Sequence, residues 1–225
     1  MTRAQDEGPL KAGGGEVEAL YDAGGNTYAL DDGVRRDVSM AGLAKLKPFF
    51  DRKYGSVTPG NSSQITDGAA WLILASEDSL KKHDLKPVGR ILDSQWAGLD
   101  PAQMGLGPVH AATPILKRNG LALNAPDYWE INEAFAAQVL GCLAAWKDDS
   151  YCREQLGLEA ALGELDEAKL NVDGGAVALG HPVGASGARI VLHLLRTLQR
   201  NGAKRGIATI CIGGGLGGAM LVEAI

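Results

Sequence analysis

The sequence has few cysteines, no long apolar run and no strong excess of either charge, and each lack excludes a class of protein. Its three cysteines are an odd number without metal-ligand spacing, which excludes a disulfide framework and predicts a reducing, cytoplasmic compartment. No apolar run reaches the ~18 residues that a membrane span requires, and the first residues form no apolar signal stretch. The net charge of −5 argues against nucleic acid as the main partner, because phosphate binding requires clustered Lys and Arg.

The chain also lacks a hydrolase elbow, a phosphate loop and a metal-binding motif. Its most glycine-rich stretch, residues 213–218, resembles a nucleotide-binding loop in composition alone. Such a loop opens a helix early in a βαβ unit, whereas this stretch lies between the last two expected strands. We therefore expect no metal site and no bound cofactor.

Local patterns predict alternating strands and helices, and hence an α/β fold with a mixed sheet covered by helices. Strands are expected at 88–97, 128–131, 205–212 and 218–225, the last two forming an antiparallel hairpin across a glycine turn. Helices are expected at 39–50, 76–82, 113–118, 134–146, 159–163 and 185–199, with Ser39 capping the first.

Three further stretches are less regular. The apolar run 68–77 fits a strand buried on both faces or a buried helix, because periodicity does not separate the two. Residues 1–45 are charged and punctuated by glycines, which predicts an irregular surface segment. The charged stretch 147–169 is longer than a connection needs and is expected to be a surface excursion.

Two reactive side chains stand among glycines near the end of the sequence. His181 lies in Gly-His-Pro-Val-Gly-Ala-Ser-Gly (180–187), and the helix that follows would keep its imidazole neutral and able to take a proton. The alternative is a turn histidine satisfied by a carbonyl. Cys211 ends an apolar strand and precedes three glycines, whose N–H groups could form an oxyanion hole. The alternative is an inert packing thiol.

Asn132 and Glu133 follow the short strand expected at 128–131. In isolation they fit the cap and first-turn acid of the next helix. A functional role for Asn132 therefore depends on the motifs around it.

Four motifs in order give the sequence a family resemblance. They are Asn132-Glu-Ala-Phe-Ala, Asn171-Val-Asp-Gly-Gly-Ala, the His181 motif and Cys211-Ile-Gly-Gly-Gly. Together they are similar to the C-terminal half of thiolases, the acetyl-CoA acetyltransferases and 3-ketoacyl-CoA thiolases. The segments beginning at Thr58 and Met104 also resemble the family, so the resemblance covers residues 31–225.

The resemblance implies a thiolase-like fold with a mixed five-stranded sheet covered by helices. It implies that residues 1–45 are a remnant of the loop domain, 46–85 the end of the N-terminal core domain, and 86–225 the C-terminal core domain. It also implies coenzyme A thioesters as substrates, a role in fatty acid metabolism, and a homo-oligomer of dimer or tetramer type.

The resemblance assigns roles in thioester-dependent Claisen condensation and thiolysis. His181 would activate the nucleophilic cysteine, Cys211 would move the α-proton, and Asn132 would fix a water of the first oxyanion hole. The Gly213 N–H would serve a second oxyanion hole. The positions that match the pantetheine and acyl site are Ser63, Met104 and Phe135.

The nucleophilic cysteine of the family is missing from this sequence. Cys142 lies inside an expected helix and Cys152 in the charged excursion, so neither has the strand-to-helix context of that nucleophile. The chain would then be a fragment of a thiolase, a subunit whose N-terminal half is on another polypeptide, or a non-catalytic acyl-CoA-binding or protein-interaction homologue. Because a lone half leaves apolar surface uncovered, we expect aggregation or tight association with a second polypeptide.

Overall fold

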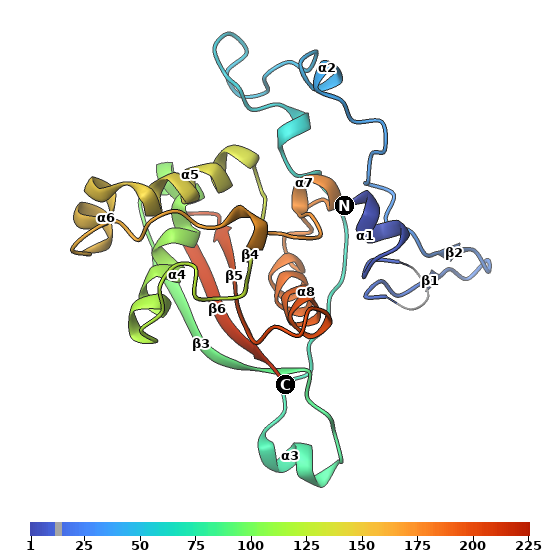
Figure 1. The fold of residues 1–225 in the computed structure, drawn as a ribbon. Helices are drawn as coiled ribbons and strands as arrows, with labels where there is room; N and C mark the ends of the chain where they lie inside the picture. The colour runs from blue at the N-terminus through green and yellow to red at the C-terminus, as the bar shows by residue number, and fades with distance from the viewer. Residues whose placement is uncertain (12–14) are drawn as a thin grey trace. The chain divides into compact units, whose positions relative to one another are not determined.

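The computed structural model describes residues 1–11 and 15–225, which divide into two compact units (Figure 1). The first unit comprises Met1–Asp67, Glu133–Ala136 and Val172–His181. The second comprises Gly68–Asn132, Ala137–Asn171 and Pro182–Ile225. In the described part of the chain, no helix is both long and apolar enough to cross a membrane.

A mixed sheet forms the centre of the second unit. Its order is β3 (Gly89–Gly98), β6 (Leu216–Ala224), β5 (Arg205–Ile212) and β4 (Tyr128–Ile131). The β3–β6 and β6–β5 pairs are antiparallel, and β4 runs parallel to β5. The α/β fold and the β5–β6 hairpin are confirmed.

The sheet has four strands among the described residues, not the expected five. Beside β4 there is a single parallel bridge between Trp129 and Leu170. The next residue, Asn171, has a φ of 45°, which turns the chain out of the extended conformation and ends the pairing with β4 at this point.

Helices cover both faces of this sheet (Figure 1). One face packs on α4 (Gly107–Arg118) and α5 (Ala136–Lys147), with Trp129 and Trp146 in its core. The other face packs on α8 (Ser186–Arg200), whose Leu194 and Leu198 are fully buried. Side chains alternate between the faces along β5, since Ile207 belongs to the first core and Ala208 to the second.

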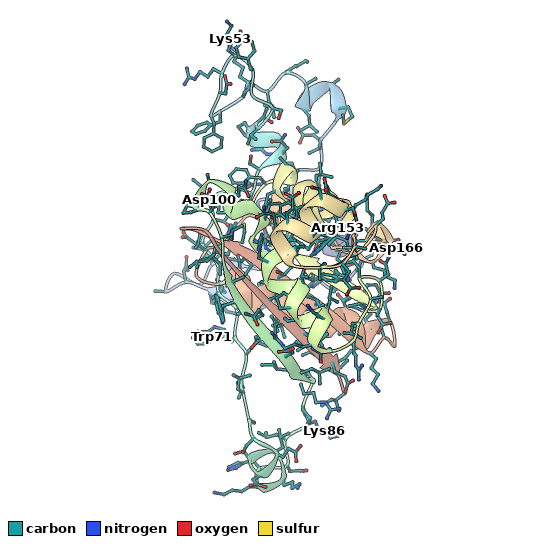
Figure 2. The ribbon with its side chains drawn as sticks, turned by 90° about the vertical axis from the view of Figure 1, so that its left-hand side faces the viewer. Lys53, Trp71, Lys86, Asp100, Arg153 and Asp166 are labelled. Carbon is teal, nitrogen blue, oxygen red and sulfur yellow. The ribbon has the colours of Figure 1, made fainter. Side chains whose placement is uncertain are left out.

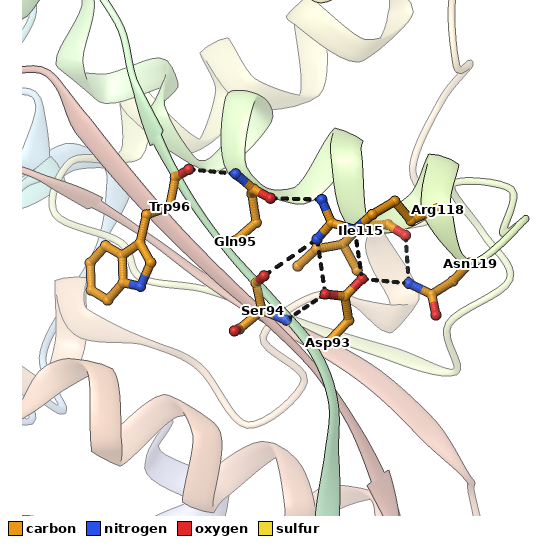
Figure 3. Close-up of polar contacts among 7 residues, drawn as sticks. All are labelled: Asp93, Ser94, Gln95, Trp96, Ile115, Arg118 and Asn119. Atoms are coloured by element: carbon orange, nitrogen blue, oxygen red, sulfur yellow. Dashed lines mark hydrogen bonds and ion pairs between the residues drawn. The ribbon is translucent and has the colours of Figure 1, made fainter.

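A polar cluster fixes the end of α4 to the edge strand β3 (Figure 3). The Arg118 guanidinium donates to both Asp93 carboxylate oxygens, at 3.1 and 2.9 Å, and to the Gln95 side chain at 2.7 Å. Asn119 donates to the same carboxylate at 2.8 Å. These bonds hold the pKa of Asp93 below its usual range, so the contact persists over the neutral pH range.

A second ionic cluster lies three residues earlier along β3, where Arg90 pairs with Glu223 of β6. The nearly buried Glu223 carboxylate accepts from Arg90 at 2.6 Å and from Arg205 at 2.9 Å. These bonds lower the pKa of Glu223 to about 2. They join β3, β5 and β6 where the three strands lie side by side.

The remaining helices of the second unit are short. They are α3 (Glu77–Lys82), α6 (Asp149–Leu156) and the 3-10 helices η2 (Pro101–Leu106) and η3 (Glu167–Lys169). The helix expected at 159–163 is wrong, and α6 lies upstream of it. Asp148 caps α6 through the Tyr151 N–H, and Gly157 at a φ of 61° ends it.

The apolar run 68–77 is neither the buried strand nor the buried helix that we expected. Residues 63–76 form neither helix nor strand, and Trp71 is 84% exposed and Ile73 92% exposed. Figure 2 shows Trp71 on this segment, which leads into α3. A buried strand requires a sheet edge and a covering layer, and no described segment of the chain supplies them here.

The first unit contains short elements: α1 (Thr2–Asp6), the β1–β2 pair (Leu20–Tyr21, Thr27–Tyr28), α2 (Met40–Leu43), η1 (Pro59–Asn61) and α7 (Ala176–Leu179). The helix expected at 39–50 is limited to α2. Ser39 caps it, as predicted, through the Gly42 N–H at 3.1 Å. Gly42 has a low helix propensity, and Pro48 disfavours the helical conformation at Lys47, so the expected helix does not continue to residue 50. Residues 12–14 of the stretch expected to be irregular lie outside the described residues.

Candidate active site

Cys211 lies at the end of β5, opposite Gly217 of β6. By the alternation along β5, its side chain lies on the face that α4 and α5 cover. The thiol is buried, and burial raises its pKa. At neutral pH the group is therefore a thiol that can donate a proton.

A three-residue glycine turn follows and returns the chain to β6. Gly214 and Gly215 have φ values of 85° and 83°, which residues other than glycine rarely adopt. Gly213 is exposed, and a Cβ placed there would meet no atom within 4 Å. Gly213 and Gly214 thus present their backbone to open space just beyond the end of β5.

The start of β6 lies unusually close to α4. A Cβ on Gly217 would overlap the carbonyl group of Gly107, so both positions require glycine. Met104 lies just before this contact in η2, and its carbonyl accepts the Gly107 N–H. Met104 is therefore linked to Cys211 through Gly107 and Gly217, because Gly107 bonds to Met104 and Gly217 pairs with Cys211.

Asn132 follows β4 directly, and its N–H donates to the Thr209 carbonyl of β5 at 3.0 Å. Its side chain is 2% exposed, yet neither Oδ1 nor Nδ2 has a hydrogen-bond partner among the described residues. It is therefore not a helix cap. A buried amide without partners costs about 1–3 kcal/mol, so this arrangement needs a functional explanation.

His181 ends the part of the chain that belongs to the first unit. Its N–H donates to the Gln64 carbonyl at 3.0 Å, directly after α7. Gly180 has a φ of 87°, and a Cβ there would collide with Thr66. Only glycine fits at position 180, so the path of the backbone into His181 is fixed at this point.

Ser63 and Phe135 are also held together in the first unit. The Ser63 N–H donates to the Ala134 carbonyl at 2.9 Å, and Ser62 and Phe135 form an antiparallel bridge. Because Gln64 contacts His181, the segment 62–64 connects Ser63, Phe135 and His181.

The predicted site residues therefore form two groups. The first unit holds Ser63, Phe135 and His181, and the second holds Met104, Asn132, Cys211 and Gly213. Within each group the residues are connected by backbone contacts. The chain passes from one unit to the other at Asn132–Glu133 and again at His181–Pro182.

The other two cysteines are buried in the second unit. The Cys142 thiol lies 3.4 Å from the Gly105 carbonyl, and burial, with a smaller effect of nearby Cys211, raises its pKa to about 12. Cys152 is also buried, with its sulfur 3.4 Å from the Ala145 carbonyl. Neither has the environment of an activated nucleophile. No group of three His, Cys, Asp or Glu in the described ranges is arranged to hold a metal ion.

Sequence reasoning missed two contacts next to Asn132. Glu133 does not act as the first-turn acid of α5, because its carboxylate accepts the Val177 N–H of α7 at 3.1 Å. Asn171, which was part of a motif but had no assigned role, contacts Ile131 through its side chain. Both contacts join residues about 40 positions apart, and no local pattern signals them.

Comparisons with known proteins agree with these motifs. The C-terminal domain model of thiolase matches residues 85–224, and the N-terminal domain model matches residues 14–78. A 3-ketoacyl-CoA thiolase of Yersinia enterocolitica is 44% identical over 86% of this chain and 44% of its own length. The human mitochondrial 3-ketoacyl-CoA thiolase is 41% identical over 98% of this chain and 51% of its own.

Solved structures give the same result. An acetyl-CoA acetyltransferase of Bacillus anthracis matches with a TM-score of 0.78 and 39% identity, covering 92% of this chain and 48% of that one. The dimeric peroxisomal thiolase of Saccharomyces cerevisiae matches with a TM-score of 0.75 and 34% identity, over the same shares. The chain spans about half the length of these relatives. With its motifs, its sheet and both domain matches in agreement, the chain belongs to the thiolase family.

Proposed function

We propose that this chain supplies half of a thiolase active site. The reaction is the reversible, thioester-dependent Claisen condensation of acyl-CoA and acetyl-CoA, and its reverse, the thiolysis of 3-ketoacyl-CoA. The observation that carries the proposal is the Asn132 amide, which is buried without partners among the described residues. Its cost is justified where the amide binds a water or an oxyanion during the reaction.

The nucleophile in this proposal is a cysteine outside this chain. In thiolysis its sulfur attacks the 3-keto carbon, the bond between the α and β carbons breaks, and the electron pair passes to the enolate of acetyl-CoA. The thiol of coenzyme A then takes the acyl group from that cysteine. Cys142 is excluded from this role by its burial and its raised pKa.

Each group of this chain then has one task. Cys211 gives its proton to the enolate carbon in thiolysis and removes it in condensation. The raised pKa of Cys211 supports the acid role at neutral pH. His181 takes the proton of the attacking thiol, and the Gly213 N–H stabilises a thioester oxygen.

The proposed substrates are coenzyme A thioesters, contacted by Ser63, Met104 and Phe135, and no further cofactor takes part. The relatives named 3-ketoacyl-CoA thiolase support this substrate class and a role in fatty acid metabolism. We further propose a cytoplasmic location and an assembly of dimer or tetramer type. A dimeric yeast relative supports the assembly.

The proposed partner is a polypeptide or segment equivalent to the N-terminal thiolase half. The exposed apolar segment around Trp71 and Ile73 supports this, because it has the composition of a strand without a sheet to join. The boundaries 45/46 and 85/86 remain our proposed limits of the loop, N-terminal and C-terminal core domains. The chain alone is then incomplete and inactive.

The test begins with native mass spectrometry of the protein purified from its own cells. A second polypeptide that carries the nucleophilic cysteine, together with acetoacetyl-CoA thiolysis, supports the proposal. Cys211→Ala and His181→Ala should each abolish that thiolysis, and Asn132→Ala should reduce it strongly but leave measurable turnover; full activity in any of them would refute the assigned role. A single species that binds acetyl-CoA without turnover supports a non-catalytic acyl-CoA-binding protein instead.

A further inference from the structure

The edge of β4 is closed by one residue in place of a strand. β4 pairs with β5 on one side through residues 128–131. On its other side, the Asn171 N–H donates to the Trp129 carbonyl at 2.9 Å, next to the Trp129–Leu170 bridge. The backbone then turns away, because Asn171 has a φ of 45°.

Beyond this turn, the Asn171 side chain hydrogen-bonds β4 in the way that a neighbouring strand would. Its Oδ1 accepts the Ile131 N–H at 2.9 Å, and its Nδ2 donates to the Ile131 carbonyl at 2.9 Å. An aspartate would lack the donor, a glycine would lack both groups, and asparagine tolerates the left-handed conformation. The two bonds form a clamp on both polar groups of Ile131.

The clamp acts on the residue bonded directly to Asn132. On the opposite side, the Asn132 N–H is held by the Thr209 carbonyl at 3.0 Å. The Thr209 hydroxyl in turn donates to the Gly218 carbonyl at 2.8 Å, which ties this point to β6. The backbone at Asn132 is therefore fixed from both sides of β4.

The Asn132 side chain has no hydrogen bond of its own among the described residues. Its direction is then set by its backbone and by packing. A loss of the Ile131 clamp would let this backbone move, and small displacements of a catalytic group have large effects on rate. Asn171 is thus connected to Asn132 through the backbone of Ile131.

We propose that Asn171 is a positioning residue that orients the Asn132 amide through its clamp on Ile131. The effect on turnover rests on the proposed function of Asn132, whereas the clamp itself does not. The inference therefore has one readout in the backbone and one in catalysis.

Asn171→Gly tests the clamp with little strain, because glycine keeps the positive φ and removes only the side-chain bonds. Asn124→Ala is the matched control. Asn124 also makes two side chain–backbone bonds, to the Glu164 carbonyl at 2.7 Å and from the Asp166 N–H at 2.8 Å, and neither bond is to β4. Both variants lose the same kind of interaction.

The first measurement uses the purified protein and does not depend on activity. In Asn171→Gly, hydrogen exchange at the Ile131 amide should rise by about 10-fold or more. The NMR signals of the Asn132 side-chain amide, identified by their loss in Asn132→Ala, should shift. Asn124→Ala should leave both unchanged. Unchanged exchange and unchanged Asn132 signals in Asn171→Gly would overturn the proposal.

The second measurement is a double-mutant cycle on acetoacetyl-CoA thiolysis by the assembly that contains this chain. Asn171→Gly should lower kcat about 10-fold with KM changed less than twofold, and should cost nothing further in the Asn132→Ala background. An equal loss of kcat in both backgrounds would overturn the positioning role. If the parent assembly shows no thiolysis, the proposed function fails while the exchange and NMR results still decide the clamp.

Discussion

The buried thiol of Cys142 predicts that the second unit loses stability in alkali. Its pKa is raised from 9.0 to about 12, mainly by burial. The folded state therefore holds the proton more tightly than the unfolded chain. Stability from this group is fully present below pH 9 and is lost as the pH rises through about 12. Cys142→Ala removes the titrating group and should remove this part of the pH dependence.

The size of the effect follows from the two pKa values. A tenfold change in a protonation equilibrium is worth about 1.4 kcal/mol, so the full loss is about 4 kcal/mol and the loss by pH 10.5 is roughly 2 kcal/mol. Cys142→Ala has its own constant cost from lost packing and from the lost contact with the Gly105 carbonyl. The test is therefore the difference in free energy of unfolding between wild type and Cys142→Ala, and how much that difference changes from pH 8 to pH 10.5.

Urea unfolding under a reductant measures this difference. Near-UV circular dichroism can follow it, because the Trp129 and Trp146 rings pack 5.3 Å apart in the same core as Cys142. Val139→Ala, a buried change on the same helix, provides a control whose cost should not vary with pH. A difference between wild type and Cys142→Ala that stays flat, or an equal pH slope in Val139→Ala, would refute the reasoning.

Three further predictions concern the sheet and the exposed segment. Gly217→Ala should lower the free energy of unfolding by about 1–3 kcal/mol, because the new Cβ would meet the Gly107 carbonyl of α4. Gly213→Ala should change the free energy of unfolding by less than about 0.5 kcal/mol. Equal losses in the two variants, measured by urea unfolding, would contradict this prediction. Glu223→Gln should lower the urea midpoint above pH 4.5. The difference from wild type should vanish as the pH falls through about 2, because the Glu223 carboxylate is then protonated in the folded and the unfolded state. A difference that stays constant through an acid titration would contradict this prediction. Trp71→Lys should reduce self-association of the chain in analytical ultracentrifugation without changing its free energy of unfolding. Trp96→Lys, on β3, is the control and should leave self-association unchanged. A larger effect of Trp96→Lys than of Trp71→Lys would show that the segment around Trp71 is not the associating surface.

The sequence predicted those elements whose partners are close along the chain. The β5–β6 hairpin needs only a glycine turn between two apolar runs, and α8 has its apolar positions at helical spacing. The run around Trp71 failed for the opposite reason. Its composition is that of a buried strand, but burial depends on neighbours that no part of the described chain provides.

The same distinction applies to the candidate site. Cys211 and His181 are recognisable because reactive side chains among glycines form local motifs. The burial of the Asn132 amide and the clamp by Asn171 come from contacts between distant segments. A motif can assign the chain to a family and mark Asn132 as a site residue, but only the fold shows which residues orient the Asn132 side chain.

The Asn171 clamp also affects how the protein can associate. An edge strand with free backbone groups can pair with another chain, which is a common route to aggregation. At the β4 edge, another strand could pair only after displacing an asparagine that already bonds both polar groups of Ile131. Intermolecular strand pairing should therefore begin away from this edge, at the exposed segment around Trp71, which forms no strand in the described residues.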